Sequence, residues 1–153
     1  MRPIHTVVVD TSVFADYYLL FPGDPDRHRR ARGVLDRLSD LGLPVYEPFL
    51  FEVELRAVLV RRIDPKNVLD ILNIVLGHIN VIDEKLIHDK AAEIALLTGC
   101  RAVDAYYIAV AKHVDAVLIT SDKTMRDNAS KSGVEAYYLL SNKDYNTLIS
   151  RLS

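Results

Sequence analysis

Short hydrophobic runs and longer amphipathic stretches alternate along the chain. The short runs are apolar and rich in β-branched or aromatic residues, which is typical of buried strands. The stretches between them carry apolar residues at three-and-four spacing, which predicts helices with one buried face. The predicted strands are residues 4–10, 44–48, 78–83, 116–120 and 134–140. The predicted helices are residues 12–21, 27–42, 49–62, 64–76, 84–99, 102–114 and 123–133, with an eighth after residue 141.

Several residues mark the ends of these helices. Gly42 and Gly99 follow the last apolar positions of two helices, where glycine commonly ends a helix. Asp64 precedes Pro65, a good N-cap followed by a first-turn proline. Ser141, three residues before an acid, resembles a capping box. The alternation of strands and helices predicts a three-layer α/β/α fold with a central, mostly parallel sheet of about five strands.

Length and composition are those of one globular domain, and we expect residues 1–153 to form it. Nineteen lysines and arginines face 21 acids, a formal net charge of −2, which argues against coating nucleic acid by bulk charge. A local basic groove remains compatible with that balance. The single Cys100 excludes an internal disulfide and a cysteine-based zinc site. With no apolar leader core near the N-terminus, we expect a cytoplasmic protein.

Acidic residues follow two of the predicted strands. Asp10 comes directly after "VVV" and Asp122 follows "LITS". Ligand sites in open parallel sheets gather outside the carboxyl ends of the strands, so these carboxylates converge if the strands are neighbours. Asp104 opens an otherwise apolar helix, and Glu54 lies in a helix that begins just after a strand. Each acid also has an ordinary interpretation, as a helix cap, a first-turn acid or a solvated helix position.

Four acids in one pocket would have to be protonated or neutralised by a cation. Two ionised carboxylates 4 Å apart repel by about 4 kcal/mol at an intermediate dielectric. Oxygen-rich sites without cysteine suit hard divalent ions, Mg²⁺ or Mn²⁺. An ion that keeps waters and takes few protein ligands can bind a phosphate oxygen and activate a water, which is the chemistry of phosphodiester hydrolysis.

Three motifs in this order resemble the PIN domain family. They are "VVVDTSVF", "VDAYYIAVAK" and "LITSDKTM", with an acid in the helix after the second strand, and the likeness covers essentially the whole chain. The likeness is greatest to VapC-type toxins and related prokaryotic PIN proteins. It implies a PIN-like α/β/α fold and a Mg²⁺- or Mn²⁺-dependent endoribonuclease that hydrolyses single-stranded RNA with a metal-activated water.

The resemblance also assigns residues. The catalytic acids carried over from the family motifs are Asp10, Glu54, Asp104 and Asp122. The implied metal ligands are Asp10, Asp104 and Asp122, while Ser12 and Thr120 would fix the carboxylates. Glu54 is preferred to Glu52, because residues two apart on a helix point in different directions and "ELRAVL" fits the family pattern.

The resemblance further implies a homodimer and, for a toxin, a cognate antitoxin protein. Residues 14–21 and 71–79 are apolar candidates for its docking surface, although core burial explains both equally well. A stand-alone RNA-processing nuclease, or a catalytically silent module that binds RNA or protein, would share this sequence pattern. Candidate phosphate contacts, with solvated helix faces as the alternative, are the basic cluster 27–32, the group Arg56, Arg61 and Arg62, and the pair Lys123 and Arg126.

Two other classes of α/β protein fit less well. A phosphotransfer receiver would have a second acid beside Asp10 and a lysine closely following the last strand, but the next acid, Asp16, is distant and the first lysine after "YYLL" is Lys143. A haloacid-dehalogenase-like phosphatase would have an aspartate where Ser12 stands.

Overall fold

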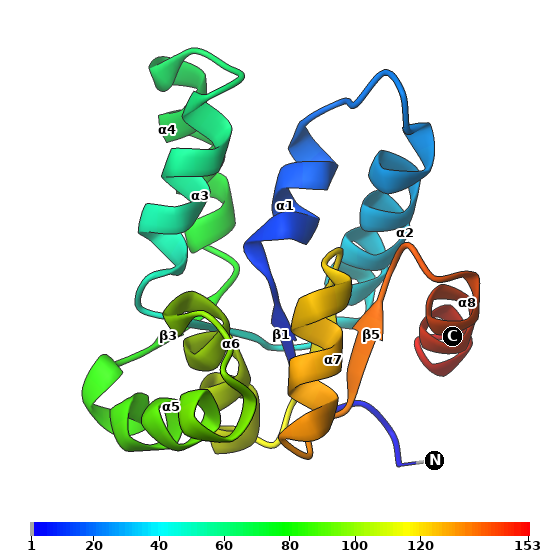
Figure 1. The fold of residues 1–153 in the computed structure, drawn as a ribbon. Helices are drawn as coiled ribbons and strands as arrows, with labels where there is room; N and C mark the ends of the chain where they lie inside the picture. The colour runs from blue at the N-terminus through cyan, green and yellow to red at the C-terminus, as the bar shows by residue number, and fades with distance from the viewer. Residues whose placement is uncertain (1) are drawn as a thin grey trace.

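The computed structural model describes residues 2–153, and within them five strands form one parallel sheet flanked by eight helices (Figure 1). The strands are β1 (Val7–Val9), β2 (Val45–Pro48), β3 (Asn80–Ile82), β4 (Val117–Thr120) and β5 (Ala136–Tyr138). The helices are α1 (Thr11–Tyr18), α2 (Pro25–Leu41), α3 (Phe51–Val60), α4 (Pro65–Leu76), α5 (Glu84–Thr98), α6 (Ala102–His113), α7 (Lys123–Lys131) and α8 (Asn142–Arg151). The predicted three-layer α/β/α fold is confirmed.

The strand order is β3-β2-β1-β4-β5, and every neighbouring pair is parallel. The first strand therefore lies at the centre of the sheet, between β2 and β4. Val9 of β1 is in register with Ile119 of β4, although 110 residues separate them along the chain. Since all strands point the same way, their carboxyl ends meet at one edge, and the residues that follow β1 and β4 emerge side by side.

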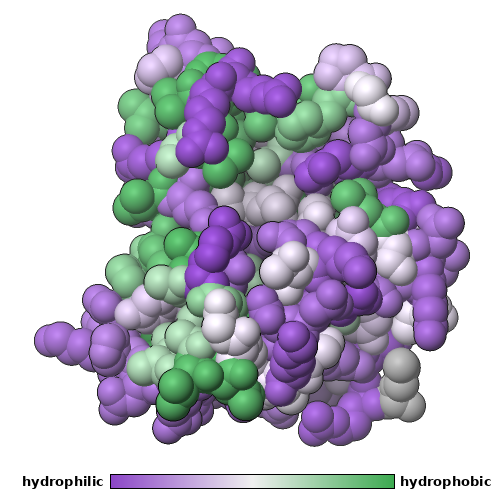
Figure 2. All heavy atoms as spheres, viewed as in Figure 1, coloured by the Kyte–Doolittle hydropathy of each residue, from purple (hydrophilic) through white to green (hydrophobic). Residues whose placement is uncertain are grey.

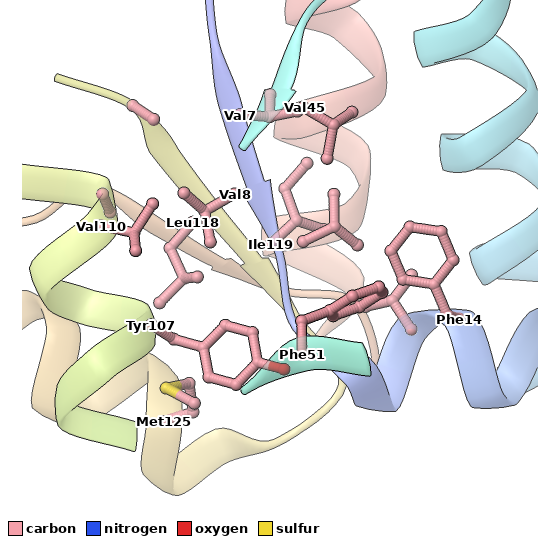
Figure 3. Close-up of a cluster of buried hydrophobic side chains, with 14 of the residues drawn as sticks. Val7, Val8, Phe14, Val45, Phe51, Tyr107, Val110, Leu118, Ile119 and Met125 are labelled. Atoms are coloured by element: carbon pink, nitrogen blue, oxygen red, sulfur yellow. The ribbon is translucent and has the colours of Figure 1, made fainter. Parts of the chain in front are cut away.

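The sheet is buried on both faces. Consecutive side chains of a strand point to opposite faces, and all three valines of β1 have no exposed surface. Figure 3 shows Val8 and Leu118 beside Val110 of α6, whereas Ile119 lies on the side of Phe14 from α1. Helices therefore cover both faces, which explains why these strands read as uninterrupted apolar runs.

The predicted helix boundaries hold at most ends. Gly42 and Gly99 end α2 and α5 in the left-handed conformation, with φ of 63° and 69°. Asp64 caps α4 by accepting a hydrogen bond from the backbone N–H of Lys66. The predicted start of the helix 27–42 is wrong by two residues, because α2 begins at Pro25, where a proline loses no helical hydrogen bond. The predicted helix 12–21 ends three residues earlier, at Tyr18.

Between residues 2 and 153, no single helix has the length and hydropathy to span a membrane. Helices α5 and α6 have that length and hydropathy only when taken together, and they are bent by 119° relative to each other.

Candidate active site

The site lies at the carboxyl edge of the two central strands. Asp10 follows the last residue of β1, and its backbone N–H donates to the carbonyl of Ile119 at 2.9 Å. Asp122 lies two residues beyond the end of β4. The predicted convergence of these two acids therefore follows from the adjacency of β1 and β4 in the sheet.

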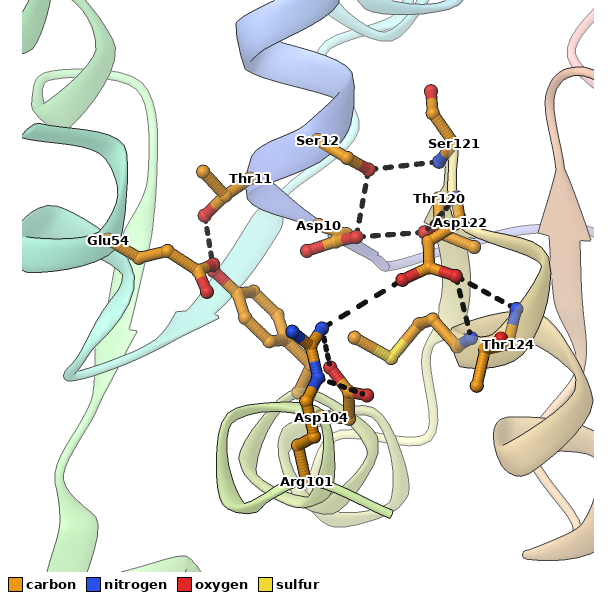
Figure 4. A network of polar contacts seen from close by, with 12 residues as sticks. Asp10, Thr11, Ser12, Glu54, Arg101, Asp104, Thr120, Ser121, Asp122 and Thr124 are labelled. Atoms are coloured by element: carbon orange, nitrogen blue, oxygen red, sulfur yellow. Dashed lines mark hydrogen bonds and ion pairs between the residues drawn. The ribbon is translucent and has the colours of Figure 1, made fainter. Parts of the chain in front are cut away.

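Two hydroxyl groups hold the carboxylate of Asp10 (Figure 4). Ser12 Oγ and Thr120 Oγ1 both donate to Asp10 Oδ2 at 2.8 Å. Ser12 Oγ also accepts from the N–H of Ser121 at 3.0 Å, and Thr120 Oγ1 accepts from the N–H of Asp122 at 2.9 Å. Because both hydroxyls donate to one oxygen, the second oxygen of Asp10 is left facing away from them, toward the other acids.

Asp122 caps a helix as well as facing the site. Its Oδ1 accepts from the backbone N–H groups of Thr124 at 2.8 Å and Met125 at 3.4 Å, at the start of α7. Its Oδ2 lies 3.9 Å from Nη2 of Arg101. The ordinary interpretation of Asp122 as a cap is thus correct for one oxygen. Asp10 precedes α1 in the same way but makes no side-chain cap.

Asp104 occupies the first turn of α6 and is 2% exposed. Arg101 donates to both of its oxygens, from Nε to Oδ2 at 3.4 Å and from Nη2 to Oδ1 at 3.2 Å. Burial raises the pKa of Asp104, the arginine opposes that rise, and the negative charges of Asp122 and Glu54 add to it. Sequence reasoning assigned no role to this arginine. The available signal was an arginine at the N-cap of α6, a position that favours small polar residues.

Glu54 reaches the site through a tyrosine. The hydroxyl of Tyr107 donates to Glu54 Oε1 at 2.7 Å, and Thr11 Oγ1 is hydrogen-bonded to the same hydroxyl. Glu52 instead forms an exposed ion pair with Arg56 at 2.7 Å, one turn further along α3. Of the two candidate glutamates, Glu54 is therefore the one that α3 turns toward the site. Tyr107 is fully buried, so it packs in the core as well as making this contact through its hydroxyl.

The sequence analysis missed a fifth acid, Glu47 of β2. It is fully buried, Oε1 accepts from the N–H of Val9 at 3.1 Å, and Oε2 has no hydrogen-bond partner among residues 2–153. Burial raises its pKa well above the usual range, and the charges of Asp10 and Glu54 raise it further. These effects favour the neutral form of Glu47, which lies next to the site. A charged residue inside an otherwise apolar strand was the signal that could have found it.

The electrostatics of Asp10 reflect the same crowding. Burial, chiefly, raises its pKa from 3.8 to about 6, and the nearby charges of Glu54 and Asp104 add to that rise. The hydrogen bonds from Ser12 and Thr120 act in the opposite direction, because they stabilise the ionised form. The four predicted acids thus influence one another, although they come from four separate segments of the chain.

The donor chemistry fits a hard divalent ion, because the site offers carboxylate and hydroxyl oxygens and Asp10 keeps one oxygen free of its two hydroxyl partners. Throughout residues 2–153, however, no three carboxylate, histidine or cysteine side chains lie close enough to hold one ion in this arrangement. The guanidinium of Arg101 lies between Asp104 and Asp122 instead (Figure 4). A metal shared by Asp10, Asp104 and Asp122 stays a prediction.

The sheet order and the acids at its carboxyl edge define a parallel α/β protein with an acidic site. A model of the PIN domain family matches residues 7–131, and the chain belongs to that family. No curated protein matches the sequence.

Solved structures share the fold. PAE2754 from Pyrobaculum aerophilum is 18% identical over 99% of this chain and 98% of its own, with a TM-score of 0.63. FitAcB from Neisseria gonorrhoeae is 24% identical over 88% and 98%, with a TM-score of 0.65. FitAB bound to an IR36 DNA fragment is 24% identical over 86% and 93%, with a TM-score of 0.62. At these identities the likeness shows the fold.

The buried carboxylate of Asp10 predicts a pH-dependent stability of the metal-free protein. The pKa of Asp10 is about 6 in the folded state and 3.8 in the unfolded chain, a difference that lowers the free energy of unfolding by about 3 kcal/mol above pH 6. The loss disappears as the pH falls from about 6 to about 4, because the folded state keeps a proton that the unfolded state releases. Asp10→Asn should therefore be more stable than wild type at pH 7.5, with the difference shrinking toward pH 4.

Urea unfolding in EDTA across this pH range measures the difference. Asp40→Asn, at an exposed position of α2, controls for the loss of one negative charge. A stability difference between Asp10→Asn and wild type that does not vary with pH would show that Asp10 is not a strained buried carboxylate.

Proposed function

We propose that this protein is a metal-dependent endoribonuclease that hydrolyses phosphodiester bonds of single-stranded RNA. PIN domains are in general nucleases, so membership of the family supports the class of activity. The observation that supports it most is the buried Asp10, held by two hydroxyls among three further acids at the carboxyl edge of the sheet. A purely structural role would favour an apolar residue or a neutral amide at so buried a position.

The proposed roles follow the contacts. Asp10, Asp104 and Asp122 are the metal ligands, and Ser12 and Thr120 keep Asp10 oriented and favour its ionised form. A bound Mg²⁺ or Mn²⁺ would supply an activated water and stabilise negative charge on the phosphate.

Glu54, held by the hydroxyl of Tyr107, would act as a further metal ligand or orient a water on the metal. Lys123 begins α7 directly after Asp122 and is a candidate for attracting RNA phosphates. The cluster at residues 27–32 is a weaker candidate, since Arg27, Arg29 and Arg32 form ion pairs with aspartates close to them on α1 and α2.

Labelled single-stranded RNA tests the activity. Cleavage should require Mg²⁺ or Mn²⁺ and stop in EDTA. Asp10→Asn should lower the rate by at least about a hundredfold, because losing a ligand should exceed the 10- to 100-fold cost of losing a group that only supports one. RNA binding without cleavage, unaffected by EDTA, would instead identify a catalytically silent module.

The two glutamates of α3 give a matched pair for the same assay. Glu54→Gln should slow cleavage, because Glu54 contacts Tyr107 inside the site. Glu52→Gln should leave the rate near wild type, because Glu52 pairs with Arg56 on the exposed face. The reverse ranking of the two variants would reject the assignment of Glu54.

We further propose that the protein is the toxin of a toxin–antitoxin pair, acting in the cytoplasm, with a small antitoxin seated in a groove beside α1. The groove has a volume of about 430 Å³ and is lined by residues of both apolar segments predicted as docking candidates, 14–21 and 71–79. Tyr17 and Tyr18 of α1 line one side, and Ile74 of α4 and Ile79 line another. Likeness to VapC-type toxins, together with the fold shared with FitAB, supports a partner protein. A stand-alone RNA-processing nuclease would have the same site and no antitoxin.

A small reading frame beside the gene should encode that antitoxin, and its product should block RNA cleavage. Ile74→Asp should weaken the block at least roughly tenfold, because it places a charge in an apolar contact. Leu69→Asp, on the same helix but outside the groove, is the control, since both side chains are about half exposed. Equal inhibition of the two variants would argue against this groove.

We also propose a homodimer that uses the exposed face of α5. Leu86, Leu96 and Leu97 are 61%, 90% and 66% exposed on this helix. Figure 2 shows hydrophobic side chains gathered over α5. Large contiguous apolar surfaces on soluble proteins commonly mark interfaces.

Sedimentation equilibrium should give about twice the 17.3 kDa mass of one chain. Leu97→Glu should shift the protein to the monomer, because a charge would replace an apolar contact in the interface. Leu20→Glu, equally exposed but following α1, should remain dimeric. A wild-type protein of monomeric mass would refute the homodimer, and a dimeric Leu97→Glu protein would refute this interface.

A further inference from the structure

One cation already lies inside the acidic site. Arg101 immediately precedes α6, and its side chain contacts Asp104 in the first turn of that helix. Its guanidinium donates to both oxygens of Asp104 and lies 3.9 Å from Asp122 Oδ2 (Figure 4). The arginine side chain is 73% exposed, whereas that of Asp104 is 3% exposed.

The oxygens that Arg101 occupies are those a metal ion would need. Both oxygens of Asp104 receive its hydrogen bonds. Asp122 has committed Oδ1 to the backbone N–H groups of α7, so Oδ2, the oxygen facing Arg101, is the one left for a cation. A divalent ion ligated by Asp104 and Asp122 would therefore occupy space in which the guanidinium now lies.

The arrangement is also balanced in charge. Without a cation, Asp104 would be a buried carboxylate close to two other acids, and such a group is costly unless paired. Arg101 provides the pairing from a side chain that reaches in from solvent. Because most of its surface is exposed, it can rotate outward without disturbing the packed core.

We propose that Arg101 is an internal counter-cation that competes with the divalent ion for Asp104 and Asp122, and thereby sets the metal concentration at which the site fills. The inference rests on the proposed function, since it takes these acids to be metal ligands. The competition is local: metal binding requires the arginine to leave, and the arginine returns when the metal is lost. The metal-free protein thus keeps its acids neutralised.

Titration of Mn²⁺ into the RNA-free protein tests the competition. Binding is measured by calorimetry or from the electron paramagnetic resonance signal of free Mn²⁺. Arg101→Gln should bind Mn²⁺ roughly three- to tenfold more tightly than wild type, the range for losing an ion pair with one buried partner. Arg56→Gln removes the same charge from the exposed pair on α3 and should bind Mn²⁺ as wild type does. Unchanged or weaker binding by Arg101→Gln would overturn the proposal.

A second measurement separates competition from a merely structural role. In EDTA, Arg101→Gln should melt at a lower temperature than wild type, and saturating Mn²⁺ should raise its melting temperature more than that of wild type. If Arg101 only stabilised α6, Arg101→Gln would melt at a lower temperature than wild type both in EDTA and in Mn²⁺, and its Mn²⁺ affinity would be unchanged. That result would overturn the proposal. Circular dichroism confirms that the variant is folded before either comparison.

The outcomes also distinguish this inference from the proposed function. If wild type binds Mn²⁺ and cleaves RNA while Arg101→Gln has the same affinity, the counter-cation proposal alone fails. If neither protein binds Mn²⁺ and RNA is not cleaved, the proposed function fails and takes this inference with it. Mn²⁺ binding that appears only in Arg101→Gln supports the competition in its strongest form.

Discussion

The carboxylate of Asp10 is buried where β1 and β4 end side by side, and the rest of the site is arranged around keeping it there. Ser12 and Thr120 come from the two segments that the sheet brings together, and both donate to the same oxygen of Asp10. Each hydroxyl also accepts a backbone N–H from the segment after β4. The contact therefore couples the pairing of two strands, 110 residues apart in sequence, to the orientation of one acid.

The fold followed from the sequence because its signals are local. Uniformly apolar runs, a proline at position 65 and glycines at positions 42 and 99 each act within a few residues, and the structure bears them out. Strand adjacency is different, because it depends on packing across the whole domain. The convergence of Asp10 and Asp122 was conditional on β1 and β4 being neighbours, and the sequence pattern alone leaves that pairing open.

The residues that sequence reasoning missed act through contacts with no sequence periodicity. Glu47 satisfies the N–H of Val9 at the point where β1 gives way to α1, and Tyr107 connects Glu54 to Thr11 across three elements. Tyr107 looks like an ordinary core residue, and most of its side chain is one (Figure 3). Only the position of its hydroxyl distinguishes it, and that position is fixed by tertiary packing of α6 against the sheet.

The charge balance of the site explains why so many acids can share one edge of the sheet. Burial raises the pKa of Glu47 well above the usual range, which favours its neutral form; Asp10 is stabilised by two hydroxyls; Asp104 is paired with Arg101. Each arrangement suits the burial of its residue, because a neutral acid needs no partner charge and the exposed Arg101 can reach the buried Asp104. Of the three, the pairing with Arg101 is the easiest to reverse, because it breaks by side-chain rotation alone. Rotation of Arg101 would free both oxygens of Asp104 and the oxygen of Asp122 that faces the guanidinium.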